Sequence, residues 1–453
     1  MIDILNKHIV VAGAARSGVS VSILLKEKGA VPFLSDISEI DSSVKERLQK
    51  NNILFESGGH SSKAMDGDML VLSPGVPSTS SIAVHYKDNG KPIYSEIEVA
   101  SWFNLSPIVA VTGSNGKTTV TSWLSDVWTK AGKDYIMAGN IGTALSEQVN
   151  STSPDCDLLL EVSSFQLDHI SGFHPSISMI LNITPDHLDR YNQNFQAYCE
   201  SKFRITENQN ENDWFIYNDD DSVVKNFAKR LLNGKNHPKM AAFSTEHEVP
   251  NGAFVRNGQL MINLDNKEES LMAIDQIALP GNHNLKNGMA MALAARASEI
   301  RNEFIRESLK SFEGVAHRLE KVRTLDGVTY FNDSKATNIN AVWYALDSFN
   351  VPLTLILGGR DKGNDYNELD SQIKEKVHTI IAIGEAKEAI KKQLGSVVPH
   401  MVEAGDMKEA VKLAKKTAKR GEVVLLSPAC ASFDMFDNYE HRGDMFKKAV
   451  LEL

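Results

Sequence analysis

Short apolar runs alternate with amphipathic stretches over almost the whole chain. HIVVAGA, IVAVTGS, DLLLEVS, LTLILGG and VVLLSPA are examples of the apolar runs. The stretches between them, such as SGVSVSILLKEKG, carry apolar residues at helical spacing. Strands that alternate with helices in this way are typical of parallel sheets, so the pattern predicts an α/β fold.

The length of 453 residues exceeds what one hydrophobic core supports and indicates about three domains. The alternation falls into three blocks, which we place at residues 1–97, 98–313 and 314–453. The first and third blocks are expected to form Rossmann-like sheets, and the central block a nucleotide-binding sheet.

The central block begins with IVAVTGSNGKTT at residues 108–119, an apolar run, a glycine turn and a helix start. Such a turn directs backbone N–H groups and the positive end of the helix toward one point, where a polyphosphate can bind. In a loop of this kind Lys117 would contact the β- and γ-phosphates and Thr118 would face Mg²⁺. The match to G-x-x-x-x-G-K-[ST] is incomplete, because Val111 occupies the first glycine position.

A second glycine turn, GAARSG at residues 13–18, follows the first apolar run, and Asp36 ends the next one. Strand, glycine turn, helix and strand resemble the opening of a Rossmann sheet. However, Ala15 replaces the middle glycine of G-x-G-x-x-G, and its Cβ hinders the approach of a pyrophosphate. The turn therefore favours a smaller nucleotide or a purely structural role over a dinucleotide.

Net charge and cysteine content indicate which binding partners and which cellular compartment to expect. The net charge of −10 is spread along the chain, which gives no reason to expect a nucleic acid or an anionic membrane as partner. Three widely spaced cysteines argue against a disulfide framework and fit a reducing cytoplasm. Without a signal-peptide pattern or a run of about 20 apolar residues, we expect a cytoplasmic protein with no membrane insertion.

Polar side chains that suit catalysis follow several predicted strands. Glu161 follows DLLL, and Asp186 and His187 come after ISMILNIT. The carboxyl ends of strands in open α/β sheets are where ligands bind, and a carboxylate with a neutral imidazole can hold Mg²⁺ against a γ-phosphate. The cationic and hydroxyl groups in the loops of the third block suit carboxylates and phosphates. The function-like residues of these loops are Arg318, Asp333, Ser334, Lys335, Thr337, Asp361, Lys362 and Ser432.

Motifs along essentially the whole chain, in order, resemble the Mur ligase family, and most closely its D-glutamate-adding type. They are TGSNGKTT, GNIG (139–142), EVSSFQL (161–167), NITPDHLDRY (182–191), SKFRI (201–205), LPGNHNLKN (279–287), HRLE (317–320), NDSKATN (332–338), LGGRDKG (357–363) and LSPACASFDMF (426–436). The resemblance implies a three-domain architecture: a Rossmann-like UDP-binding domain, a central P-loop ATPase domain and a Rossmann-like amino-acid-binding domain.

The resemblance also implies roles for individual residues. ATP would contact Gly113, Ser114, Asn115, Gly116, Lys117, Thr118, Thr119, Asn284, Asn287, Arg318 and Asp333. Two Mg²⁺ ions would be held by Thr118, Glu161, His187 and the carbamylated form of Lys202. The implied catalytic residues are Lys117, Glu161, His187, Lys202 and Lys335.

The implied substrates are UDP-N-acetylmuramoyl-L-alanine and D-glutamate, bound by a monomer. Ser73, Gly75, Asn140 and His187 would meet the UDP-sugar substrate, and Thr337, Lys362, Ser432 and the backbone around Tyr439 would hold D-glutamate. Tyr439 stands where the family pattern has phenylalanine, and the first glycine turn departs from the pattern at the uracil and diphosphate contacts.

Two other classes stay open. A Rossmann dehydrogenase would explain the first block, but it leaves the phosphate loop, HRLE and NDSKATN without a role. A sister amide ligase, such as a diaminopimelate- or lysine-adding enzyme or folylpolyglutamate synthetase, shares the ATPase core. The DNPR-type motif of the diaminopimelate-adding enzymes is not found, whereas SPACASFDMF is present.

Overall fold

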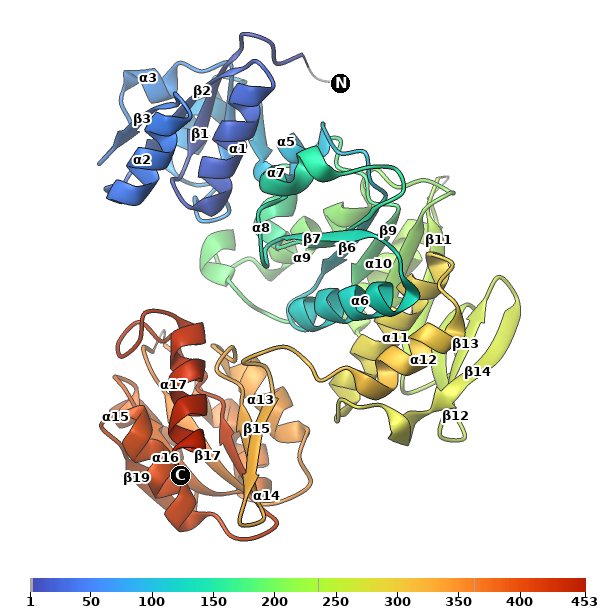
Figure 1. Ribbon diagram of the computed structural model, residues 1–453, viewed down its shortest axis with the longest axis vertical. Coiled ribbons are helices and arrows are strands. Elements are labelled where there is room, and N and C mark those ends of the chain that lie inside the picture. The colour runs from blue at the N-terminus through green and yellow to red at the C-terminus, as the bar shows by residue number, and fades with distance from the viewer. Residues whose placement is uncertain (1–2, 235, 362) are drawn as a thin grey trace. The chain divides into compact units, whose positions relative to one another are not determined.

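The computed structural model describes residues 3–234, 236–361 and 363–453 and contains three β-sheets combined with helices (Figure 1). Most neighbouring strands are parallel, with helices between successive strands. The predicted α/β fold is therefore confirmed. The chain divides into two compact units, one formed by Met1–Gln276 with Lys286–Lys310 and the other by Ile277–Leu285 with Ser311–Leu453.

The first unit begins with a five-stranded parallel sheet in the order β3-β2-β1-β4-β5. Alternate residues of β1 enter two different cores: Ile9 and Val11 pack on one face, and Val10 and Ala12 on the other. Burial on both faces is expected for a parallel sheet that helices cover on both sides. The elements are β1 His8–Ala12, α1 Arg16–Glu27, β2 Val31–Asp36, α2 Ser42–Lys50, β3 Leu54–Ser57, α3 Ser62–Met65, β4 Met69–Leu72, α4 Ser81–Asp88 and β5 Ile93–Ser95.

The same unit contains a nine-stranded sheet in the order β14-β13-β12-β11-β10-β9-β6-β8-β7. Its strands are β6 Ile108–Thr112, β7 Tyr135–Gly139, β8 Asp157–Glu161, β9 Ile177–Ile180, β10 Trp214–Asn218, β11 Lys239–Ser244, β12 Gly252–Arg256, β13 Gln259–Leu264 and β14 Lys267–Ala273. Strands β6 to β12 pair in parallel, and β13 and β14 extend the edge antiparallel. Because β9, β6, β8 and β7 are adjacent and parallel, the residues that follow them meet at one edge of the sheet.

Helices connect these strands and cover the central sheet (Figure 1). They are α5 Glu96–Ser101, α6 Lys117–Ala131, α7 Leu145–Gln148, α8 Ser164–Leu167, α9 Phe195–Phe203, α10 Ser222–Leu232, α11 Asn282–Ala297 and α12 Asn302–Ser311, with the short 3-10 turn η2 at Leu188–Tyr191. The SKFRI motif that carries Lys202 thus lies at the end of helix α9, as the sequence predicts.

The second unit is built on a six-stranded sheet in the order β15-β16-β20-β17-β18-β19, in which β15 runs antiparallel to β16. Strands β16, β20 and β17 are neighbours and parallel, so the loops that follow them share one edge. The elements are β15 Glu320–Leu325, β16 Val328–Asn332, α13 Ile339–Asp347, β17 Leu353–Gly358, α14 Asp370–Lys376, β18 Val377–Ile383, α15 Lys387–Leu394, β19 His400–Glu403, α16 Met407–Thr417, β20 Val423–Leu426 and α17 Tyr439–Leu451.

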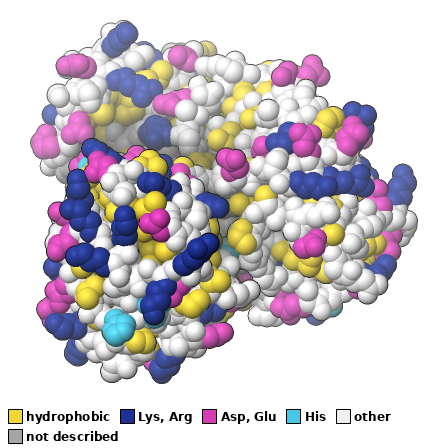
Figure 2. All heavy atoms as spheres, turned by 60° about the horizontal axis from the view of Figure 1, so that its bottom comes forward, with side chains coloured by type: hydrophobic (Ala, Val, Ile, Leu, Met, Phe, Trp, Pro, Cys, Tyr) yellow, Lys and Arg dark blue, Asp and Glu magenta, His cyan; other side chains and the backbone are white. Residues whose placement is uncertain are grey.

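Within the described ranges, no helix is both long and apolar enough to cross a membrane. Side chains of both charge signs lie on the face shown in Figure 2, in keeping with the spread of charge along the sequence.

Candidate active site

The predicted phosphate loop joins β6 to α6 at the middle of the central sheet. Gly113 and Gly116 have φ angles of +154° and +86°, which strain any residue with a side chain. Gly116 is also crowded, since a Cβ there would come within 2.6 Å of Asn287 Oδ1. Lys117 begins the first turn of α6, and Thr118 and Thr119, both buried, follow it. The strand, turn and helix start therefore have the local geometry that the sequence predicts.

Asn182, which follows β9, holds the phosphate loop in shape. Its carbonyl accepts a hydrogen bond from the backbone N–H of Ser114 (2.9 Å), and its Oδ1 accepts one from the N–H of Asn115 (2.8 Å). The Ser114 hydroxyl donates to the carbonyl of Thr184 at 2.9 Å. No local pattern in the sequence marks Asn182 as a residue that holds the loop, although it opens the motif NITPDHLDRY.

Two lysines converge on the carbonyl of Gly113. Lys117 Nζ donates to this oxygen at 2.8 Å and to the carbonyl of Ser114 at 2.9 Å. Lys202 Nζ reaches the same Gly113 oxygen at 2.9 Å, from a side chain that is only 2% exposed. Burial, reinforced by the positive charge of Lys117, holds the pKa of Lys202 well below its usual range. Lys117 thus brings a positive charge to the loop, as a polyphosphate site requires, while burial favours the neutral form of Lys202.

Glu161 lies at the end of β8, next to β6, and is almost fully buried. Its Oε1 accepts a hydrogen bond from the side chain of Asn140 at 2.8 Å, and the backbone N–H of Asn140 donates to the Glu161 carbonyl. The second carboxylate oxygen, Oε2, is buried and has no hydrogen-bond partner among the residues that the structure describes. A buried carboxylate oxygen without a donor is costly unless a ligand satisfies it.

His187 precedes η2 and adopts the left-handed conformation, with φ +51°. About half of its side chain is exposed, and Nε2 lies 3.7 Å from Oδ2 of Asp186. Burial of the ring lowers the pKa of His187, against the opposing charge of Asp186. The shift favours the neutral imidazole, which is the form that binds metals.

The proposed metal ligands do not form a ready-made site. The described parts of the chain hold no group of three or more His, Cys, Asp or Glu side chains placed to bind a metal ion. Glu161 Oε2 and a threonine hydroxyl are oxygen donors suited to Mg²⁺, whereas the amine of Lys202 is not. Glu161 and Thr118 therefore suit Mg²⁺, and Lys202 would join them only in a form that supplies an oxygen ligand.

Helix α11 carries the two asparagines predicted to contact the nucleotide, and both are buried. Asn287 lies against Gly116 of the phosphate loop, as the crowding at that glycine shows. Asn284 donates from Nδ2 to the carbonyl of Pro280 at 2.7 Å.

The SPG turn that follows β4 contacts the segment that carries His187. Arg190 donates to the carbonyls of Pro74 (3.1 Å) and Gly75 (3.2 Å), and its guanidinium lies over the ring of Phe165. Ser73 is buried and donates to the carbonyl of Gly13 at 3.0 Å, so this hydroxyl joins two turns of the N-terminal sheet. Sequence reasoning missed Arg190, although it lies within the motif NITPDHLDRY.

In the second unit, Asp333 follows β16 and is buried beside the end of β20. Its Oδ2 accepts a hydrogen bond from Ser427 (2.8 Å), and its Oδ1 accepts one from the backbone N–H of Leu319 (3.2 Å). Burial raises the pKa of Asp333 to about 7, against the effects of Ser427 and the nearby charge of Arg318. Arg318 Nε is buried without a hydrogen-bond partner among the described residues. Asp333 and Arg318 are thus close, as expected for one nucleotide subsite.

Arg442 of α17 is fully buried and joins the NDSKATN and SPACASFDMF loops. It donates from Nε and Nη2 to the hydroxyl and carbonyl of Ser334 (2.9 and 2.7 Å) and from Nη1 to the carbonyl of Cys430 (3.0 Å). Burial lowers the pKa of Arg442 to about 10. Its role does not follow from the sequence, because nothing local marks an arginine in an amphipathic helix as buried.

The remaining predicted residues of the second unit lie on the loops at the same edge. Lys335 Nζ is 5.4 Å from the ring centroid of Tyr439, and the carbonyl of Tyr439 accepts a hydrogen bond from Ser334. Ser432 is buried, and Thr337 is half-buried just before α13. Lys362 lies outside the described residues, so its predicted role remains a prediction.

The fold and the loop between β6 and α6 define an α/β protein of the phosphate-loop type, and comparisons with known proteins narrow the class. Family models match in three stretches: the MurD N-terminal domain at residues 9–82, the Mur ligase middle domain at 111–295 and the Mur ligase glutamate ligase domain at 317–430. The chain belongs to the Mur ligase family and is of the MurD type.

Individual relatives extend over the full length. A UDP-N-acetylmuramoylalanine–D-glutamate ligase of Salinibacter ruber is 47% identical, with 97% of this chain and 96% of the relative covered. The ligase of the same name from Chloroherpeton thalassium is 43% identical, with 100% and 99% covered. The crystal structure of the MurF ligase of Thermotoga maritima in complex with ADP aligns with a TM-score of 0.60 at 14% identity, over 100% of both chains, and supports the fold.

Proposed function

We propose that this chain is an ATP-dependent ligase that joins D-glutamate to UDP-N-acetylmuramoyl-L-alanine in cytoplasmic peptidoglycan precursor synthesis. The observation that carries the proposal is the edge of the central sheet, where the phosphate loop, two lysines and a buried carboxylate converge. The full-length relatives of the same name supply the substrate class.

A carboxylate does not condense with an amine in neutral water, so the L-alanyl carboxylate first needs a leaving group. Its oxygen attacks the γ-phosphorus of ATP in line, the bond from this phosphorus to the β-γ bridging oxygen breaks, and an acyl phosphate and ADP form. The neutral amine of D-glutamate then attacks the acyl carbon, the nitrogen loses a proton, and phosphate leaves from the tetrahedral intermediate. Lys117 offsets charge on the γ-phosphoryl oxygens, provided that it exchanges the carbonyls of Gly113 and Ser114 for phosphate.

Mg²⁺ fits beside this loop. Glu161, Thr118 and His187 would hold it, and Asn140 would keep the Glu161 carboxylate in place through its hydrogen bond to Oε1. A bound Mg²⁺ neutralises charge that develops on the transferred phosphoryl group. The buried Oε2 of Glu161, which has no hydrogen-bond partner among the described residues, supports this assignment.

We also propose that Lys202 is carbamylated. Only a neutral amine attacks CO₂, and the burial of Lys202 beside Lys117 favours this form. The new N–C bond forms between Nζ and the carbon of CO₂, and one proton leaves the nitrogen. The product is a carboxylate-like group whose oxygens would bind Mg²⁺, as the unmodified amine would not.

The substrate assignment is tested by the release of phosphate from ATP with UDP-N-acetylmuramoyl-L-alanine and a panel of amino acids. D-Glutamate should support turnover, and L-glutamate, D-alanine and L-lysine should be very poor, because a site built to hydrogen-bond two carboxylates rejects analogues that lack or misplace one. Equal rates with L-lysine would assign the chain to a sister ligase. Tight NAD(H) binding without ligation would favour a dehydrogenase.

Carbamylation is tested by intact mass at near-neutral pH and by activity in CO₂-depleted buffer. Activity should fall on depletion and recover with bicarbonate, and Lys202→Ala should lose most activity and show no recovery. Fully active enzyme with an unmodified Lys202 would rule the modification out.

A further inference from the structure

Four polar residues, Asn218 to Asp221, lie at the end of β10 and in the turn after it, and they contact the segment that holds the phosphate loop. Asn218 donates to the carbonyl of Leu181 (2.9 Å), and Asp221 accepts from the backbone N–H of Ile183 (2.8 Å). The segment between these contacts includes Asn182, which bonds to the loop itself. Asn218 and Asp221 thus hold the segment Leu181–Ile183 in place, and this segment in turn holds the phosphate loop.

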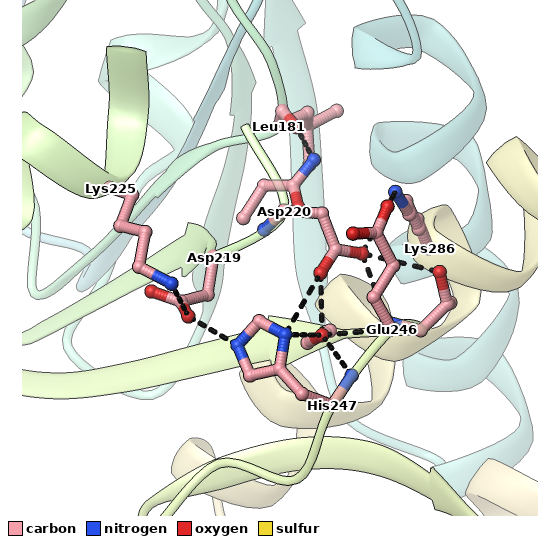
Figure 3. A network of polar contacts seen from close by, with 10 residues as sticks. Leu181, Asp219, Asp220, Lys225, Glu246, His247 and Lys286 are labelled. Carbon is pink, nitrogen blue, oxygen red and sulfur yellow. Dashed lines mark hydrogen bonds and ion pairs between the residues drawn. The ribbon is translucent and has the colours of Figure 1, made fainter. Parts of the chain in front are cut away.

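Asp220, the third of these four residues, is bound from several elements. Its side chain is 1% exposed and forms an ion pair with Lys286 Nζ at 2.8 Å. Ser244 and the backbone N–H of Thr245, both at the end of β11, also donate to it. Figure 3 shows Asp220 beside Lys286. Burial alone would raise the pKa of Asp220, but the hydrogen bonds from Lys286 and Ser244 hold it below its usual value. The carboxylate is therefore charged, and its ion pair with Lys286 stabilises this buried charge.

Lys286 lies on α11 directly before Asn287, and the two side chains leave the helix in different directions. The side chain of Lys286 pairs with Asp220 in the turn that follows β10, while Asn287 lies against Gly116. The ion pair joins the first turns of α11 to the sheet that carries the phosphate loop. A shift of α11 would move Asn287 relative to Gly116.

We propose that the Asp220–Lys286 ion pair is a positioning element for ATP, which holds Asn287 at its place beside the phosphate loop. The inference rests on the proposed assignment of Asn287 to the nucleotide. Lys286 contacts no reacting atom and acts through Asn287. Misplacing one hydrogen bond to the nucleotide is expected to raise the KM for ATP by about tenfold.

The same network provides a matched control. Lys225 of α10 forms an ion pair with the neighbouring Asp219 at 2.7 Å, and His247 contacts the same carboxylate at 2.6 Å (Figure 3). Lys225 is partly exposed, as Lys286 is, but it lies on a helix that carries no predicted nucleotide contact. Loss of Lys225 therefore removes a comparable ion pair without releasing α11.

The experiment measures KM for ATP, kcat and melting temperature for Lys286→Met, Lys286→Arg, Lys225→Met and Asn287→Ala. We expect Lys286→Met to raise the KM for ATP about tenfold with little change in kcat, and Lys286→Arg to restore most of the affinity. Lys225→Met should leave the KM for ATP unchanged. In an Asn287→Ala background, Lys286→Met should add little further loss, because both changes remove the same contact.

Two results would overturn the inference. If Lys286→Met changes the KM for ATP no more than Lys225→Met does, the ion pair has a purely structural role. If its effect adds fully to that of Asn287→Ala, Lys286 does not act through Asn287. An Asn287→Ala enzyme with normal KM for ATP would instead show that the nucleotide assignment of Asn287 is wrong, and the inference would fall with it.

Discussion

Two glycine turns of the first unit have the same layout but different surroundings. GAARSG joins β1 to α1, and GSNG joins β6 to α6. Each turn begins with a glycine of positive φ, Gly13 at +97° and Gly113 at +154°, and each leads into a helix whose first residue is a cation, Arg16 or Lys117. On layout alone, either turn could hold a phosphate.

The two turns differ in their hydrogen bonds. In the first turn the carboxylate of Asp36 accepts from the N–H of Ala14 at 2.6 Å, and Gly18 packs against the carbonyl of Gly13. In the second turn, Lys117 and Lys202 both donate to the carbonyl of Gly113. A backbone amide already bound to a carboxylate is a poor anion site, whereas the ammonium group of Lys117 attracts an anion to the second turn. The charge around a glycine turn, more than its spacing, decides what it binds.

The largest expected effect is on Lys117. Lys117→Ala should lower the rate of ligation by about 10²–10³ or more and leave the fold intact, because the side chain contacts loop carbonyls and not the core. Arg16→Ala, at the matching position of the first turn, should leave the KM for ATP and the ADP yield unchanged. Circular dichroism with steady-state kinetics checks both. Near-normal turnover of Lys117→Ala would show that the second turn, like the first, has a purely structural role.

Gly18 and Gly116 are both crowded, and alanine at each position should have a different effect. We expect Gly18→Ala to change only the stability of the protein, and Gly116→Ala to change the KM for ATP as well. Gly18→Ala places a Cβ against the backbone carbonyl of Gly13, so it should destabilise the protein by about 1–3 kcal/mol and leave the KM for ATP unchanged. Gly116→Ala meets both an unfavourable φ and Asn287 Oδ1, at a cost of about 1–2 kcal/mol for the backbone alone. It should raise the KM for ATP about tenfold or more. Melting temperature and ATP kinetics distinguish the two, and an effect of Gly18→Ala on the KM for ATP would contradict the comparison.

The strand–turn–helix units were predictable because their signals are local. An apolar run, a glycine and a helix start lie within a dozen residues, so both glycine turns and the strand that Glu161 ends follow from the sequence. The contacts that shape the site join distant residues. Asn115 and Asn182 are 67 positions apart, and Ser334 and Arg442 are 108 apart. Nothing in one sequence pairs such positions, which is why Asn182, Arg190 and Arg442 were missed.

The position of Lys117 shows a second limit of the sequence. The motif predicts a lysine that reaches the phosphates, and in the structure its ammonium lies on the carbonyls of Gly113 and Ser114. A long, flexible cation binds the acceptors nearest to it, and the loop itself offers two. The sequence specifies which group is available, and the local acceptors decide where it rests.

The smallest expected effect is a pH dependence that the two turns should not share. The pKa of Lys202 is lowered in the folded protein, whereas in the unfolded chain it is near the ordinary value of 10.5. Between these two values the unfolded state binds more protons, so the stability of the protein rises with pH across this window and falls as pH drops through the lowered pKa. Lys202→Met lacks this contribution.

In CO₂-free buffer, the urea midpoint of the wild type should therefore increase relative to that of Lys202→Met as pH rises toward 10.5. Thermal unfolding can follow the same trend, because a change in the free energy of unfolding shifts the melting temperature. Arg16→Met, which removes the exposed cation of the first turn, should give a curve parallel to the wild type. Parallel curves for Lys202→Met would mean that the amine keeps its ordinary pKa. The second turn would then lack the buried neutral lysine that distinguishes it from the first.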